Sequence, residues 1–247
     1  MHRTAPRLAR ILACAAVPVM LVATGCSGDD NGSKKSSSSS APSHSAASPG
    51  ASAPAKAATL AKLPEVCKAV DEKTIDKVVP KAAKKEGETL PATSPMDSAS
   101  CFWAGLDKDD PKNLQYRSLT LSLKRFSADP TLGSGEKLAA NYLNQRVTKA
   151  VTEDNAKEGA KPEKIGDIGN EAQGVSTDYR KAATEGGGED DYRNAFVVTR
   201  VDNVVITVKY TGAGYEGAKN PDAGDLMKNA QDIAKEAVTS VQNANKK

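Results

Sequence analysis

Residues 118–124 show the clearest pattern in the chain, a strict alternation of apolar and polar side chains. Leucine occupies every second position, with serine or threonine between the leucines. Successive side chains of a strand point to opposite faces of a sheet, so this segment is predicted to be a strand with one buried face. Four more strands are predicted at 101–103, 175–179, 195–199 and 204–210. The pair Asp202-Asn203 is typical of a tight turn, which makes the last two strands a β-hairpin.

Three other segments have apolar residues at every third or fourth position, the spacing of an amphipathic helix. Asp71 is expected to cap a short helix that Pro80 ends. A second helix opens at Ser134. Pro221 and Asp222 begin the last helix, because proline fits the first turn and acidic side chains favour a helix N-terminus. The apolar positions of the two long helices are Ala139, Tyr142, Leu143, Val147, Ala150 and Val151, followed by Leu226, Ala230, Ile233, Ala234, Ala237 and Val241.

The predicted order of elements is helix, strand, strand, helix, three strands and helix. Strands joined by short turns run antiparallel, and their alternation leaves one face apolar. Two long amphipathic helices are available to cover that face. We therefore expect residues 61–247 to form a single globular α+β domain. Its fold class is a two-layer sandwich, with a mainly antiparallel sheet of about five strands covered by two long helices plus a short N-terminal helix.

The first 25 residues have the pattern of an export signal. Arginines precede an apolar run at 11–23, and small residues then lead to Cys26. The apolar run is too short for a comfortable membrane span. The sequence Ala-Thr-Gly-Cys at 23–26 resembles the lipobox of bacterial lipoproteins. This resemblance implies that Cys26 receives a diacylglycerol, that the signal peptide 1–25 is removed, and that the new N-terminus is acylated.

Residues 26–60 are rich in Ser, Ala and Pro and have almost no large apolar side chain. Such a segment buries too little surface to offset its ordering entropy, so we expect a disordered tether. Each buried methylene of an acyl chain adds roughly 0.8 kcal/mol, so two or three chains on Cys26 give a lasting attachment. The sequence thus predicts a protein on the outer face of the cytoplasmic membrane, facing the cell wall and held by its lipid anchor.

The four cysteines have separate roles. Cys14 lies in the signal and Cys26 is the acylation site, which leaves Cys67 and Cys101 in the exported domain. Oxidising conditions outside the cell favour a disulfide between these two. A closed loop of about 34 residues stabilises a domain by roughly 3–4 kcal/mol in the chain-entropy model. The alternative, a metal held by the two thiolates, lacks further ligands because no other cysteine or histidine follows residue 60.

Charge and histidine content limit the kinds of catalysis and binding that can be expected of residues 61–247. The only histidines are His2 and His44, so catalysis by Ser-His-Asp or Cys-His and His-ligated metals are not expected in the domain. We predict no catalytic residue, no metal site and no cofactor. Residues 1–60 contain six Lys or Arg and two Asp, so 28 basic and 29 acidic residues fall in the domain. A near-neutral domain gives no reason to expect nucleic acid as a partner.

Four further features have simple structural explanations. Residues 212–217 match G-x-G-x-x-G, but only one helix follows them, so we expect a flexible strand-to-helix loop. The acidic residues at 107–113 are expected to form a solvated turn, because Pro111 occupies a position that a calcium loop needs for a ligand. Those at 189–191 are expected to lie in a mobile polar loop. Trp103 is expected to pack against the disulfide.

Several features together resemble a family of actinobacterial lipoproteins classed as a domain of unknown function. They are the lipobox, the tether, a cysteine before the first helix, the segments 101–103, 165–172 and 201–206, and the Ala-rich last helix. The layout is also similar to the extracellular sensor domains of mycobacterial serine/threonine kinases and to PsbP-like lipoproteins, whose folds are α/β sandwiches. The resemblance implies an envelope protein and supplies no catalytic residue.

We therefore expect a non-catalytic, membrane-anchored module that binds or senses a component of the cell envelope. A small amphiphile could bind in a cavity between sheet and helices. The alternative is an accessory subunit that binds an envelope protein in a wall-assembly or signalling complex. A hydrolase that uses only Asp, Glu, Lys or Tyr is a third hypothesis, and a convergent pair of carboxylates in a deep pocket would favour it.

Overall fold

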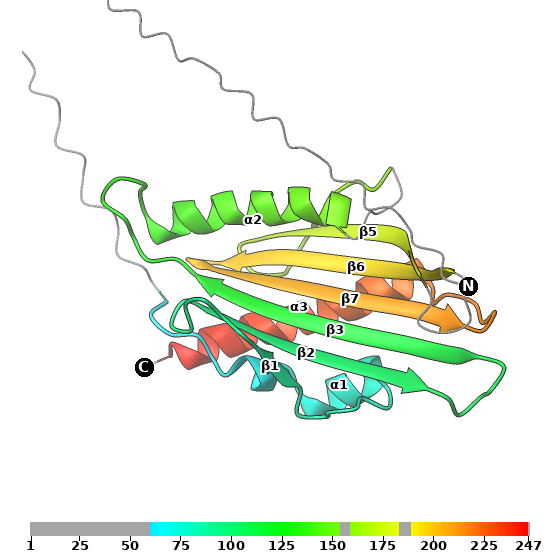
Figure 1. Cartoon of the computed structure of the whole chain (residues 1–247). Helices are drawn as coiled ribbons and strands as arrows, with labels where there is room; N and C mark the ends of the chain where they lie inside the picture. Colours follow the sequence, from blue (N-terminus) through cyan, green and yellow to red (C-terminus); the bar gives the residue numbers. More distant parts are fainter. Residues whose placement is uncertain (1–59, 154–158, 183–188, 247) are drawn as a thin grey trace, which may run out of the picture. The chain divides into compact units, whose positions relative to one another are not determined.

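The structure is a computed structural model and describes residues 60–153, 159–182 and 189–246. The described part is an antiparallel sheet of seven strands with three α-helices packed on it (Figure 1). The predicted signal peptide, the acylation site Cys26 and the tether up to residue 59 lie outside the described residues, as do His2 and His44.

The elements follow one another in the order that alternation and helical spacing predict, with additions at the sheet edges. In chain order they are the 3-10 turn η1 (Val66–Lys68), α1 (Glu72–Val78), β1 (Glu88–Leu90), β2 (Ser98–Asp107), β3 (Leu114–Arg125), α2 (Gly135–Thr152), β4 (Glu163–Ile165), β5 (Glu171–Ala182), β6 (Glu189–Val201), β7 (Val204–Tyr215) and α3 (Ala223–Ala244).

Across the sheet the strands follow the order β1-β2-β3-β7-β6-β5-β4, and every neighbouring pair is antiparallel. The five long strands are the five that the sequence predicts. The expectation of about five strands is nevertheless wrong, because the three-residue strands β1 and β4 form the two edges. Three residues are too few to show an alternation, and only pairing with β2 and β5 defines these strands. Short edge strands also limit edge-to-edge association with other chains.

The helices begin where predicted because the sequence supplies their caps. The side chains of Asp71, Ser134 and Asp222 each accept a hydrogen bond from a backbone N–H two or three residues later. Each such bond satisfies one of the donors that the first turn of a helix leaves unpaired. The local sequence therefore fixes the starts of α1, α2 and α3 without help from the sheet.

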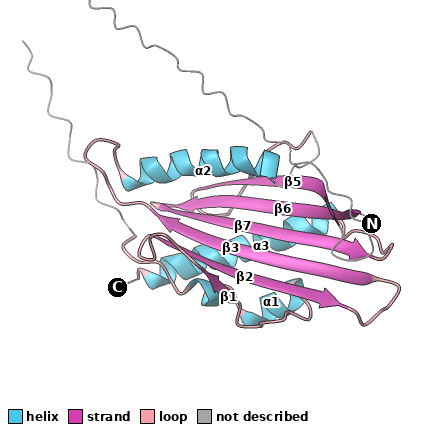
Figure 2. Ribbon diagram, viewed as in Figure 1, coloured by secondary structure: helices cyan, strands magenta, loops and turns pink. Residues whose placement is uncertain are grey.

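The two long helices lie on opposite faces of the sheet, so the predicted two-layer sandwich is wrong (Figure 2). On one face, Ile233 of α3 belongs to an apolar cluster with Val197 of β6. On the other, Leu143 of α2 clusters with Phe196 and Val198 of the same strand. Neighbouring residues of a strand point to opposite faces, so an unbroken apolar run supplies both layers. We call the two sides of the sheet the α3 face and the α2 face.

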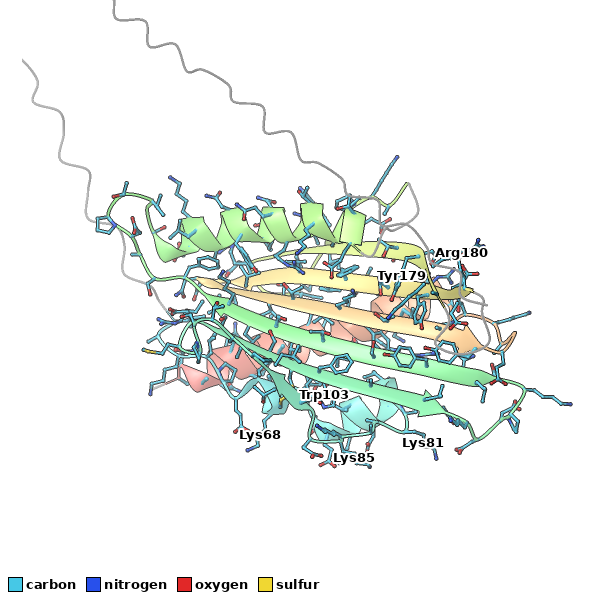
Figure 3. The ribbon with its side chains drawn as sticks, in the orientation of Figure 1. Lys68, Lys81, Lys85, Trp103, Tyr179 and Arg180 are labelled. Carbon is cyan, nitrogen blue, oxygen red and sulfur yellow. A yellow bond between two sulfur atoms is a disulfide. The ribbon has the colours of Figure 1, made fainter. Side chains whose placement is uncertain are left out.

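The disulfide predicted between Cys67 and Cys101 is present and ties η1 to β2, with the two Cα atoms 5.2 Å apart. Trp103 packs beside it as expected, with 1% of its surface exposed and its indole N–H donating to the Lys85 carbonyl at 3.1 Å (Figure 3). Gly87 has φ +78°, and a Cβ there would lie 2.4 Å from the Cys101 sulfur and 2.6 Å from the indole ring. Glycine is therefore required where this loop crosses the disulfide.

The first described residues are held at the hairpin end of the sheet. The buried Asn203 amide accepts a hydrogen bond from the Leu60 N–H and donates one to the Leu60 carbonyl, both at 3.0 Å. Asn245, just after α3, accepts from the N–H groups of Ala61 and Lys62 at 2.8 and 3.0 Å. The chain therefore enters the domain beside the β6–β7 turn and the end of α3.

Candidate functional site

The two faces of the sheet differ in how much of each the helices cover. On the α2 face, α2 packs over β5, β6 and β7, and no described helix lies in front of β2 and β3 (Figure 2). We call this uncovered area the open face. Its side chains come from alternate positions of three strands and are mostly part exposed. They are Ser100, Phe102 and Ala104 of β2, Ser118, Thr120 and Ser122 of β3, and Thr207, Lys209 and Thr211 of β7.

Small hydroxyl side chains make up most of the open face. Ser100 donates a hydrogen bond to Ser122 at 2.9 Å across the β2–β3 pair. Further along, a buried polar row crosses the sheet: Thr211 donates to the Asn194 side-chain oxygen at 2.6 Å, and the Asn194 amide donates to Thr177 at 3.3 Å. The alternation that buries leucine on the α3 face thus presents serine and threonine here. The result is a polar floor.

Four tyrosines gather at the end of this floor, far from the β6–β7 turn. Tyr116, Tyr179 and Tyr192 lie in one row across β3, β5 and β6, and Tyr215 lies two positions further along β7. Tyr116 stacks on Tyr215 with ring centres 5.7 Å apart, and Tyr179 stacks on Tyr192 at 5.1 Å. The two stacks meet edge to face, at 6.2 and 6.1 Å. We call this group the tyrosine cluster; Figure 3 labels Tyr179 within it.

The chemistry of the tyrosine cluster favours binding over proton transfer. The hydroxyls of Tyr192 and Tyr215 share a hydrogen bond of 2.8 Å. Burial, and then this hydrogen bond, raise the pKa of Tyr215 above its ordinary value, so its phenol stays neutral at physiological pH. Tyr116, Tyr179 and Tyr215 are only part buried. The cluster therefore offers ring faces and neutral hydroxyls to a partner.

Charged side chains lie where α2 meets the open face. Lys209 Nζ is 3.2 Å from one carboxylate oxygen of Glu153, and Arg146 is 3.6 Å from the other. Lys124 Nζ lies over the Tyr142 ring, 4.6 Å from its centre. Among its described residues this strip has three cations and one carboxylate, and each of the ion-paired side chains is about four-fifths buried, with side-chain exposures of 21–23%. The strip favours a partner with acidic groups.

Two sequence predictions need correction near this site. The segment Gly212–Tyr215 belongs to β7 and is paired with β3, so the G-x-G-x-x-G match begins in a strand and not in a flexible loop. Glu189–Asp191 opens β6 instead of lying in a mobile loop, and Arg180 of β5 donates to Asp191 at 2.9 Å. In both cases pairing with a distant strand orders residues whose local sequence is typical of loops.

The acidic turn at 107–113 is a solvated turn as predicted, in which Asp107 accepts from the Asp109 N–H at 3.0 Å. Lys81 pairs with Asp109 at 2.9 Å. Among the described residues, no group of three or more His, Cys, Asp or Glu side chains is arranged to hold a metal ion. The search for membrane spans, restricted to the described helices, found none that is long and apolar enough.

A groove of about 640 Å³ runs along η1, α1 and the loop that crosses the disulfide. Its lining includes the charged side chains of Glu65, Lys68, Glu72 and Lys85 beside the apolar Val70 and Ile75. Lys68 pairs with Glu65 at 2.9 Å and Lys85 with Asp76 at 3.1 Å (Figure 3). This groove is not the expected cavity between the sheet and the long helices, so the binding of a small amphiphile stays a prediction.

Sequence reasoning missed the tyrosine cluster. Aromatic residues make up only 4% of the chain, and so low a content does not predict a stacking surface. Four of the six tyrosines nevertheless meet at one place, because the register of four strands aligns them. One sequence signal could have indicated the cluster. Tyr179 and Tyr215 lie near the ends of their strands, on the face of the sheet opposite the leucines of 118–124.

Comparisons with known proteins give limited similarity. No protein-family model and no curated sequence matches the chain. LpqN, described as involved in cell envelope biogenesis of Mycobacterium tuberculosis, is 16% identical, with a TM-score of 0.31 over 60% of this chain and 75% of LpqN. The human StarD13 (DLC2) lipid transfer and protein localization domain is 8% identical, with a TM-score of 0.18 over 74% of this chain and 98% of that domain. At these low TM-scores neither similarity supports a conclusion about function.

Proposed function

We propose that this protein is a lipid-anchored, non-catalytic module of the cell envelope whose open face binds a partner protein. The observation that carries the proposal is the tyrosine cluster, which brings four part-buried or buried rings from four strands to one end of the α2 face. Tyrosine is enriched in protein interfaces and in the few residues that supply most of their binding energy.

The shape and charge of the open face define the kind of partner. A broad floor of Ser and Thr side chains, built across three strands, suits a protein partner, whose contacts spread over many residues. The strip formed by Lys124, Arg146, Lys209 and Glu153 carries excess positive charge. We therefore expect the partner to place acidic side chains over this strip and apolar or aromatic ones over the tyrosine cluster.

The tether joins the domain far from the tyrosine cluster. The chain enters the domain at Leu60, beside the β6–β7 turn, whereas Tyr215 lies at the opposite end of β7. Strand rise puts these two ends about 35 Å apart. The attachment point therefore leaves the tyrosine cluster unobstructed, and a flexible tether would let it meet a partner in the wall layer or on a neighbouring envelope protein.

Site-specific photo-crosslinking tests the binding surface in the full-length protein in its host. A photo-reactive residue at Thr120 on the open face should give one discrete protein adduct. The matched control is the same residue at Lys235, exposed on α3 on the other side of the sheet. The double variant Tyr116→Ala/Tyr179→Ala should abolish the Thr120 adduct. Equal adducts from Thr120 and Lys235, or an adduct unaffected by the double variant, would overturn the proposed surface.

Fractionation tests the anchor separately. Cys26→Ser removes the thiol that accepts the diacylglycerol, so the protein should move from the membrane to a soluble fraction outside the cytoplasm. Wild-type protein should remain with membranes after a high-salt wash, since acyl chains and not charge hold it. Unchanged membrane retention of the variant contradicts acylation at Cys26 but leaves the test of the open face intact.

A further inference from the structure

A second surface, on the α3 face, brings polar groups from four segments of the chain together. A groove of about 460 Å³ lies where the end of α1, strands β3 and β7 and the start of α3 meet. Its volume is within the range of small-molecule sites. The polar and charged side chains that line it are Lys77, Arg117, Tyr210, Asp222, Asp225, Lys228 and Asn229. We call it the Arg117 groove.

Arg117 is held in place by its own strand. One terminal nitrogen donates to the Tyr116 carbonyl at 2.7 Å, and the other donates to the Gln115 side-chain oxygen at 3.1 Å. Neither partner is a carboxylate, and Arg117 forms no ion pair within the described part of the chain. A guanidinium has five N–H donors. Arg117 therefore lies in the groove without any described carboxylate at ion-pair distance and with donors left for a ligand.

The first glycine of the G-x-G-x-x-G match lets Pro221 form one wall of this groove. A Cβ at Gly212 would lie 2.4 Å from the Pro221 ring, which is closer than two carbon atoms can approach. Gly212 is paired with Arg117 in the β3–β7 ladder, so the Pro221 ring packs on β7 next to the guanidinium. The motif that resembles a dinucleotide fingerprint thus has a different role, which is to make room for Pro221.

Tyr210 forms a neutral floor. Its side chain is 1% exposed, and its hydroxyl donates to the Val78 carbonyl at the end of α1. Burial raises the pKa of Tyr210, and the nearby Arg117 and Asn229 offset the rise only in part. The phenol therefore adds no negative charge, and the guanidinium, the amide and the hydroxyl converge on one place.

Charge at the rim also favours an anion. Lys77 of α1 and Lys228 of α3 are exposed and form no ion pair with any described residue. Of the two carboxylates, Asp222 is engaged in capping α3, where it accepts from the N–H groups of Gly224 and Asp225 at 2.7 and 3.1 Å. Three cations thus face two carboxylates across the groove.

From these contacts we propose that the Arg117 groove binds a small molecule that carries a phosphate or carboxylate group. Arg117 makes the charge-assisted hydrogen bonds, Asn229 donates from its amide, and Lys77 and Lys228 close over the anion from the rim. Arginine suits this role because its planar donors match the oxygens of both groups. The groove lies on the opposite face of the sheet from the open face, so this inference is independent of the proposed partner surface.

Titration calorimetry on the full mature chain in detergent tests the groove. The probes are inorganic phosphate, glycerol 3-phosphate and succinate, each at constant ionic strength. We expect saturable binding of at least one probe with one site per chain. Arg117→Gln should weaken that binding about tenfold or more, the usual cost of losing charged hydrogen bonds. The matched control is Lys235→Gln, which removes an exposed cation of α3 that does not line the groove and should leave the affinity unchanged.

A second variant guards against misfolding of Arg117→Gln. Lys77→Gln/Lys228→Gln changes only exposed side chains and should weaken binding several-fold while the melting temperature stays unchanged. Preference among the probes identifies the ligand: glycerol 3-phosphate above inorganic phosphate indicates a lipid headgroup or phosphodiester, and succinate above both indicates a carboxylic acid. No saturable binding of any probe, or equal affinities for Arg117→Gln and Lys235→Gln, would overturn the site.

Discussion

The two faces of the sheet are built from the same strands but differ in how they are packed. The α3 face buries Trp103, three leucines of β3 and the stripe of α3 in one cluster, and the disulfide lies at its margin. On the α2 face, α2 covers only one side, and the remainder presents hydroxyls and four tyrosines. Apolar burial is the main favourable term in folding, so the α3 face supplies most of the stability. The open face is then available for recognition at little cost to the fold.

The largest contrast should appear between adjacent residues of β3. Leu121→Ala removes a fully buried side chain from the α3 face and should lower the free energy of unfolding by about 2–5 kcal/mol. Thr120→Ala, one position away on the open face, should change it by less than about 0.5 kcal/mol. Urea denaturation measures both. Similar losses from the two variants would contradict the division of roles between the faces.

Loss of the disulfide should be nearly as costly. Cys67→Ala/Cys101→Ala opens a loop whose ends are 34 residues apart and should remove about 3–4 kcal/mol of stability. Fluorescence of Trp103, which packs beside the bridge, reports the unfolding transition. Tyr116→Ala provides the comparison on the open face and should cost clearly less. A thiol assay that finds two free cysteines in the exported, unreduced protein would contradict the disulfide itself.

Disrupting the buried polar row of the α2 face should cost an intermediate amount of stability. Asn194 is fully buried and joins Thr177 and Thr211. Asn194→Ala leaves both hydroxyls without this partner and should destabilise the domain by about 1–3 kcal/mol. Ser176→Ala, on an exposed position of β5, is the control and should be near neutral. A neutral Asn194→Ala would show that water replaces the amide and that the open face extends further than described.

Raising the pH above 10 should lower the stability of the domain through one buried tyrosine hydroxyl on each face of the sheet. Burial raises the pKa of Tyr210 on the α3 face and of Tyr215 on the α2 face above the ordinary value of 10.0. Both phenols hold their protons more tightly when folded, so their stabilisation is complete below pH 10 and falls as pH rises above it. Each phenol should lower the free energy of unfolding by no more than about 1 kcal/mol between pH 10 and 11. Tyr215→Phe and Tyr210→Phe should each flatten this decline in denaturation curves; a slope unchanged in both variants would count against the burial of these hydroxyls.

The apolar run at 195–198 is a sequence feature that indicates helices on both faces of the sheet. The run Ala195-Phe196-Val197-Val198 is apolar at every position, whereas 118–124 alternates. A continuous apolar run indicates a strand buried on both faces, and therefore helices on both sides of the sheet. Its length alone also fits a segment of buried helix, so pairing with β5 and β7 is what settles its structure.

The sequence by itself determined the features that depend on neighbours along the chain. Caps at Asp71, Ser134 and Asp222, the alternation in β3 and the pairing of the only two cysteines in the domain all follow from local chemistry or simple counting. Tertiary structure alone decided which face each helix covers, where the edge strands form, and that tyrosines up to 99 positions apart meet in one cluster. Amphipathic spacing says that a helix has an apolar side but not which side of a sheet receives it, and only strand register brings distant side chains into contact.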